Sequence, residues 1–148
     1  MTTLSIGGPI VTTETTTYPP RLATSKGMLW TGRVLSTLIV LFMLMDGVMK
    51  LFKPHFVVEA TTKLGYPEST IVPIGLAATL GAILYAIPQT AVLGAIILTG
   101  FLGGAVATHV RAGESNWYFA VLFGVIAWLG LVLRDERLRD LLPIRRTR

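Results

Sequence analysis

Four long apolar segments set the pattern of this chain. They run over residues 30–52, 70–87, 90–110 and 117–133, and the last three contain no Asp, Glu, Lys or Arg. A helix that crosses a bilayer needs about 20 mostly apolar residues, with a usable range of roughly 17–25. Each segment falls in that range. The pattern therefore predicts an all-α fold, a four-helix transmembrane bundle.

Short polar links separate these segments. Pro88 and Gln89 alone join the second to the third, which forces an antiparallel hairpin, and Pro88 stops the second helix. Residues 112–116 join the third to the fourth. The longer link, residues 53–69, is predicted to carry a short interfacial helix over residues 55–64. The run Gly65-Tyr66-Pro67 would end that helix.

The chain ends differ from the membrane domain, which we place at residues 28–142. Residues 1–27 are rich in Thr and contain Gly-Gly and Pro-Pro pairs, so we expect a disordered segment that is not a signal peptide. Residues 143–148 form a basic tail.

Composition excludes a water-soluble domain. The 148 residues are 52% hydrophobic and only 14% charged, whereas soluble domains carry about 25% charged residues. The mean hydropathy is +0.65. Cysteine is absent, which excludes disulfides, Cys-based metal sites and thiol redox chemistry within the chain.

The net charge of +5 carries a topology signal. Nine basic residues lie on the side of the two termini: Arg21, Lys26, Arg33, Arg134, Arg137, Arg139, Arg145, Arg146 and Arg148. Four lie on the other side: Lys50, Lys53, Lys63 and Arg111. Because Lys and Arg accumulate in cytoplasmic loops, both termini are predicted to be cytoplasmic. The basic surplus lacks interleaved aromatic residues, which disfavours a nucleic-acid partner.

Four polar residues are candidates for chemistry. They lie near the C-terminal ends of the first and third spans, on the side of the membrane opposite the chain termini. Asp46 and Lys50 lie four residues apart, on one helix face, where they can form an ion pair. His109 and Arg111 end the third span at the same bilayer level. A structural ion pair and cations at a helix C-terminus explain them without a function. The functional interpretation is one polar pocket formed by Asp46, Lys50, His109 and Arg111.

The outer loop adds His55 and Glu59 to that pocket as further contributors. A His beside a carboxylate can transfer protons to a quinone or bind an anion. No pair of ligands has a spacing such as HxxxH, so no metal site is predicted.

Small residues mark two helix faces. The third span contains Gly100, Gly103 and Gly104, and the second contains Ala77 and Gly81 four residues apart. In lipid, small residues let helix backbones approach closely. We expect these positions to pack helices within the bundle rather than to form a dimer.

Two stretches carry a family resemblance. The sequence RVLSTLIVLFMLMDGVMKLFK at residues 33–53, with GYPES at 65–69, and PQTAVLGAIILTGFLGGAVATHVRAG at 88–113 resemble the DoxX-like family of small bacterial membrane proteins. The resemblance covers residues 30–142 and implies a four-helix membrane bundle. It also implies a link to redox chemistry, because the wider family is named after a subunit of a thiosulfate:quinone oxidoreductase. Some relatives belong to oxidative-stress membrane complexes.

Three functions follow as hypotheses. The first is a non-enzymatic accessory subunit of a redox or stress-response complex in the bacterial inner membrane, with the bilayer and other subunits as partners. The second is a quinone-linked oxidoreductase subunit, in which His109 and Asp46 handle protons while Lys50 and Arg111 hold an anionic substrate. The third is a protein that binds or transports a small molecule or lipid. The absence of cysteine argues against a sulfur relay.

Overall fold

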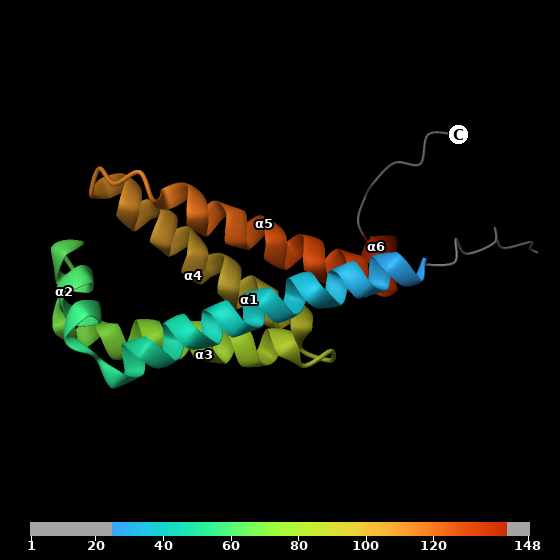
Figure 1. The fold of residues 1–148 in the computed structure, drawn as a ribbon, viewed down its shortest axis with the longest axis horizontal. Coiled ribbons are helices and arrows are strands. Elements are labelled where there is room, and N and C mark those ends of the chain that lie inside the picture. The colour runs from blue at the N-terminus through green and yellow to red at the C-terminus, as the bar shows by residue number, and fades with distance from the viewer. Residues whose placement is uncertain (1–24, 142–148) are drawn as a thin grey trace, which may run out of the picture.

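The computed structural model describes residues 25–141, with side chains described through residue 139. The regular structure in this part of the chain is all helical, and it contains no strand (Figure 1). The elements are α1 (Lys26–Phe52), α2 (His55–Lys63), the 3-10 turn η1 (Glu68–Thr70), α3 (Ile71–Ala86), α4 (Ala91–Arg111), α5 (Trp117–Arg134) and α6 (Glu136–Leu141). The all-α prediction is confirmed. The predicted disorder of residues 1–27 falls almost wholly outside the described residues, as does the basic tail.

Four of the helices are long and apolar enough to cross a membrane: α1, α3 together with η1, α4 and α5. They pack as a ring, in which α1 and α4 each contact both α3 and α5. Hence α1 lies diagonally across from α4, and α3 from α5. The start of α1 and the end of α5 lie at the same end of the bundle (Figure 1).

The boundaries of α1 show why sequence patterning misplaced its start. The helix begins four residues before the predicted Trp30, because the Ser25 hydroxyl accepts a hydrogen bond from the Met28 amide at 3.2 Å and caps the first turn. At the other end Lys53 adopts a left-handed conformation, with φ +48°, just before Pro54. Proline disfavours helical geometry at the preceding residue, so the chain turns there into α2.

Glycines hold the long helices together. At the α1–α3 contact, a Cβ added at Gly47 or at Gly75 would overlap atoms of the other helix. One added at Gly32 would lie 2.8 Å from the Arg134 backbone nitrogen of α5. At Gly94 of α4 it would lie 2.1 Å from the Tyr85 nitrogen of α3. The large buried side chains, such as Ile39, Met43, Leu98 and Leu131, fill the space between these contacts.

The small-residue faces expected to pack inside the bundle mostly lie outside it. A Cβ at Gly100, Gly103 or Gly104 would meet no atom of another helix, and Ala77 is exposed. Of these five positions only Gly81 sits at a helix contact, against Leu98. The expectation is wrong for α4, because the bundle turns the opposite face of that helix, with Gly94 and Leu98, towards α3.

The bundle is splayed at one end. The α1–α3 pair and the α4–α5 pair diverge towards α2, which lies across the open end (Figure 1). The short helix predicted in the link is confirmed as α2, and it contains no fully buried residue. The polar residues of the candidate site lie at this end of the bundle.

Candidate functional site at the splayed end

Asp46 and Lys50 form the predicted ion pair on α1. The Lys50 side chain is 19% exposed and that of Asp46 30% exposed, so the pair is largely withdrawn into the bundle. The Lys50 ammonium lies 5.9 Å from the centre of the Phe101 ring of α4. A cation at this distance from an aromatic face is attracted to it. The Lys50 end of the pair therefore faces the diagonal helix α4.

His109 takes a different partner. Its Nδ1 lies 2.8 Å from a carboxylate oxygen of Glu114 in the α4–α5 loop. The loop reverses at Gly113, whose φ of +71° suits glycine, and this brings Glu114 back over the end of α4. The imidazole is thereby oriented by a carboxylate that the sequence analysis had not singled out.

Arg111 and its neighbour Thr108 join α4 to the link after α2. The Arg111 guanidinium donates to the Leu64 carbonyl at 3.4 Å. The Thr108 hydroxyl donates to the Gly104 carbonyl, so the Tyr66 hydroxyl is the donor in its 2.7 Å bond to Thr108. Tyr66 thereby fastens the link after α2 to α4 at the splayed end.

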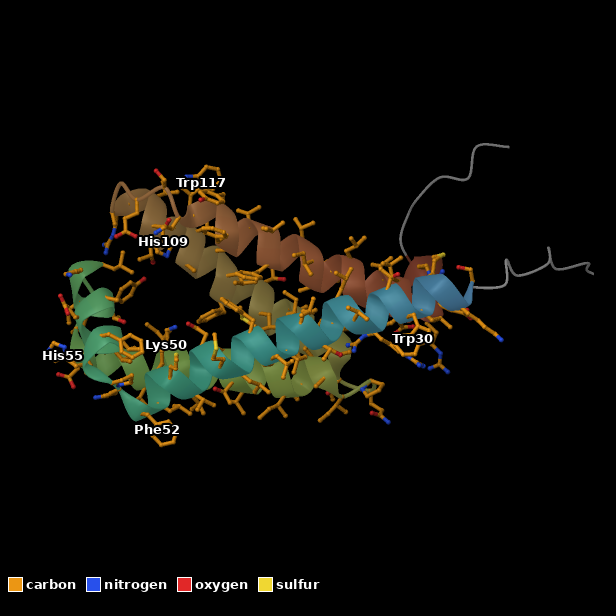
Figure 2. All side chains as sticks on the ribbon, viewed as in Figure 1. Trp30, Lys50, Phe52, His55, His109 and Trp117 are labelled. Atoms are coloured by element: carbon orange, nitrogen blue, oxygen red, sulfur yellow. The ribbon has the colours of Figure 1, made fainter. Side chains whose placement is uncertain are left out.

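The four residues of the predicted pocket therefore fall into two groups. Lys50, with Asp46, and His109 come from opposite sides of the opening (Figure 2). Within the described side chains, no hydrogen bond or ion pair connects Asp46 or Lys50 to His109 or Arg111. The order of the helices brings both groups to the same end of the bundle. Because the two helix pairs diverge there, the polar atoms of each group take part in separate interactions.

Of the two candidate residues on α2, Glu59 lies nearer the splayed end of the bundle than His55 does. The His55 side chain is 95% exposed and lies on the outer side of α2 (Figure 2), 3.9 Å from Glu59. Glu59 binds Lys63, one turn along α2, at 2.7 Å. That hydrogen bond and the charge attraction lower the pKa of Glu59 and raise the pKa of Lys63.

A cavity of about 380 Å³, here called the end cavity, opens between α2 and the α4–α5 loop. On the α2 side it is lined by Phe56, Glu59, Ala60, Lys63 and Leu64. On the other side it is lined by His109, Glu114 and Asn116. Of the six predicted site residues it contains Glu59 and His109. Lys63, Glu114 and Asn116 were missed, because their sequence neighbourhoods read as ordinary loop and helix surface.

The model of the DoxX-like family matches residues 34–130, which include every residue of the end cavity. This chain belongs to the DoxX-like family. Neither the curated proteins nor the solved structures contain a significant match. The family assignment agrees with the four membrane-spanning helices. It assigns no role to the end cavity, whose role is therefore inferred from the chemistry of its lining residues.

This DoxX-like protein has a second hollow, the α4–α5 groove, on the outer face of those two helices. It measures about 560 Å³ and is almost entirely apolar. Gly103, Val106, Gly124 and Leu129 are among the residues that line it. At one edge the Trp128 indole donates to the Thr99 hydroxyl at 2.8 Å.

A buried polar cluster in the DoxX-like bundle lies nearer the end of the chain termini. The fully buried Tyr85 donates its hydroxyl hydrogen to the Ala127 carbonyl at 2.7 Å and accepts from Ser36 at 3.1 Å. Arg134 donates to the Tyr85 carbonyl at 2.6 Å and covers its ring at 4.7 Å. All polar atoms named here are satisfied, so the cluster locks helices α1, α3 and α5.

The described part of the chain contains no group of three His, Asp or Glu residues able to hold a metal ion. His55 and His109 lie on different elements and each has its own carboxylate neighbour. The chemistry available at the splayed end is therefore that of paired charges and hydrogen-bond donors around a water-accessible cavity.

Proposed function

We propose that this DoxX-like protein is a non-enzymatic accessory subunit of a redox or stress-response complex in the bacterial inner membrane. It acts by seating a transmembrane helix of a partner subunit in the α4–α5 groove. The bilayer surrounds the rest of the bundle, and both chain termini face the cytoplasm.

The observation that carries this proposal is the contrast between two sets of glycines. Gly32, Gly47, Gly75 and Gly94 each occupy a contact between helices, where a Cβ would overlap a neighbour. A Cβ added at Gly100, Gly103 or Gly104 would have no neighbour within 4 Å among the described residues. Glycine in a helix interior costs about 1 kcal/mol relative to alanine. Gly100 and Gly104 form a GxxxG spacing on the exposed surface of α4, and their neighbour Gly103 lines the groove. Small residues at this spacing let a second helix approach closely in lipid.

The groove also suits a helix better than a solute. Its lining offers the Thr99 hydroxyl as its one side-chain polar group apart from the Trp128 indole, and these two bind each other. A polar substrate would lose its hydration there without compensating bonds. An apolar helix would instead gain close packing against the glycine backbone.

The pairing of charges at the splayed end favours this role over the quinone-linked alternative. That mechanism needs Asp46 and His109 to share a proton pathway. In the described structure Asp46 binds Lys50, and His109 binds Glu114. Purified protein that reduces quinone with thiosulfate, and loses this activity in His109→Ala, would overturn the accessory role.

Co-purification from native membranes tests the groove. Gly103→Leu and Gly104→Leu should remove a stoichiometric membrane partner that the wild-type chain retains. Ala77→Leu is the matched control, because Ala77 is an exposed small residue on α3, away from the groove. Equal retention by all three variants would contradict the proposal. A partner band consisting of a second copy of this chain would replace the accessory role with a homodimer.

A further inference from the structure

The end cavity lies at the level of lipid headgroups. The 21 residues of α4 extend about 31 Å, close to the roughly 30 Å thickness of a bilayer's hydrocarbon core. His109 stands two residues before the end of that helix. Trp117 and Tyr118 are exposed at the same end, as in the aromatic belts of membrane proteins. A lipid beside α2 would therefore present its headgroup, and not its acyl chains, to the polar side of the cavity.

The cavity places both signs of charge within one small space. The residues that line it include the acidic Glu59 and Glu114, the basic Lys63, and the polar His109 and Asn116. The two Glu side chains and Lys63 together sum to one negative charge. Such a set matches a ligand that carries a cation beside an anion, and it repels a ligand with only negative charge.

We propose that the end cavity binds an aminoethyl phosphate group, the headgroup of phosphatidylethanolamine. Lys63 and Asn116 donate to the phosphate oxygens. Glu59 and Glu114 accept hydrogen bonds from the primary ammonium. Phe56, which is 58% exposed at the edge of the cavity, covers the glycerol end. This site is independent of the partner proposed for the α4–α5 groove.

The chemistry of the carboxylates selects the amine. A primary ammonium has three N–H donors and can bind both carboxylates by charge-assisted hydrogen bonds. A choline headgroup has the same charge but no N–H to donate. A glycerol headgroup offers no cation at all, so its phosphate would meet the two carboxylates without compensation.

The ion pairs present in the cavity do not prevent binding. The Glu59–Lys63 and His109–Glu114 pairs are partly exposed to solvent, and such pairs contribute little net stability. A zwitterionic headgroup exchanges partner for partner, because its phosphate replaces Glu59 beside Lys63 while its ammonium occupies the freed carboxylates. Lys63 therefore keeps an anionic partner in the bound state, and the two carboxylates share the one ammonium.

Native mass spectrometry of the full chain in detergent provides the first test. The protein is titrated in parallel with phosphatidylethanolamine, phosphatidylcholine and phosphatidylglycerol of identical acyl chains. We expect saturable retention of phosphatidylethanolamine at concentrations about tenfold lower than for the other two, the factor expected for one charge-assisted hydrogen bond. Equal retention of the three lipids overturns the proposal.

Variants then locate the site. Glu114→Gln and Lys63→Gln should each weaken retention of phosphatidylethanolamine about tenfold, and Lys63→Arg should keep it. The matched controls are Lys53→Gln and Glu68→Gln, an exposed pair at 3.3 Å that lies outside the cavity. Circular dichroism verifies that each variant is folded. A loss as large in the controls as in the cavity variants overturns the proposal, as does retention in Glu114→Gln.

A soluble competitor distinguishes the two sources of this chemistry. If glycerophosphoethanolamine displaces the lipid at comparable concentrations, the headgroup alone is recognised and a soluble ligand of this class also fits. If only the lipid binds, the acyl chains contribute alongside Phe56. Both results support the site. Binding of neither the lipid nor the soluble headgroup refutes it.

Discussion

The Tyr85 hydroxyl donates a hydrogen bond of 2.7 Å to the Ala127 carbonyl and so joins α3 to α5, which are diagonal helices of the bundle. Side chains that bridge a diagonal oppose the splaying that the opposite end displays (Figure 1). Tyr85 is completely buried, so its hydroxyl is shielded from the surroundings of the bundle. The closed end of the bundle is thus held by a polar bond, and the open end is free to form a cavity.

Tyr85→Phe should destabilise the bundle by roughly 0.5–2 kcal/mol, the range for hydrogen bonds between membrane helices. Reversible unfolding in mixed detergent micelles measures this loss. Ser36→Ala is the control, because it removes the 3.1 Å Ser36 contact and keeps the bond to Ala127. A larger loss in Ser36→Ala than in Tyr85→Phe would mean that the α1 contact dominates.

Two alanine substitutions on α4 should have opposite effects. Gly94→Ala places a Cβ against the α3 backbone, which must shift, so we expect a loss of about 3 kcal/mol or a failure to fold. Gly100→Ala meets open space and should be neutral or stabilising by up to about 1 kcal/mol in the isolated chain. The same unfolding assay compares them. Equal losses would show that α4 packs in another orientation.

The ion pair on α1 predicts a coupled response. Asp46→Asn leaves the Lys50 ammonium inside the bundle with Phe101 as its remaining attraction. We expect a coupling energy of about 1 kcal/mol from a cycle that combines Asp46→Asn with Lys50→Met, which keeps the apolar stem. A coupling energy of zero would show that the pair contributes nothing to stability.

The Glu59–Lys63 ion pair on α2 predicts a lowered pKa for the Glu59 carboxyl. Lys63 holds the pKa of Glu59 below its ordinary value of 4.5, so a carbon NMR titration of that carboxyl should give a midpoint below 4.5. In Lys63→Gln the midpoint should return towards 4.5. Because the folded pKa is depressed, the stabilisation of α2 is present above the unfolded value and is lost as the pH falls through the folded pKa. An unchanged midpoint in Lys63→Gln would exclude the pairing in solution.

The predicted orientation has a direct measurement. A reporter fused after Arg148 should report the cytoplasm, and one inserted at Gly113 should report the opposite side. The physical reason is the larger number of Lys and Arg residues on the side of the termini. Reversed reporter activities would place the end cavity on the cytoplasmic face.

The linear pattern was sufficient to predict the spans, their short links and the Asp46–Lys50 pair. Apolar length and i, i+4 spacing are local properties, and lipid leaves a helix as the natural way to satisfy the backbone of each span. The short helix α2 could be predicted for the same reason, since Pro54 and Gly65 flank it.

Which face each helix turns inward was decided by tertiary packing alone. In lipid both faces of a span are apolar, so periodicity does not separate the buried Gly94 from the open Gly100, Gly103 and Gly104. The splay of the two helix pairs likewise separates Lys50 from His109 and brings Glu59 and Glu114 to one cavity. Sequence spacing determined the level of each polar residue in the membrane, and helix rotation and crossing, set by backbone contact at glycines, determined its partners.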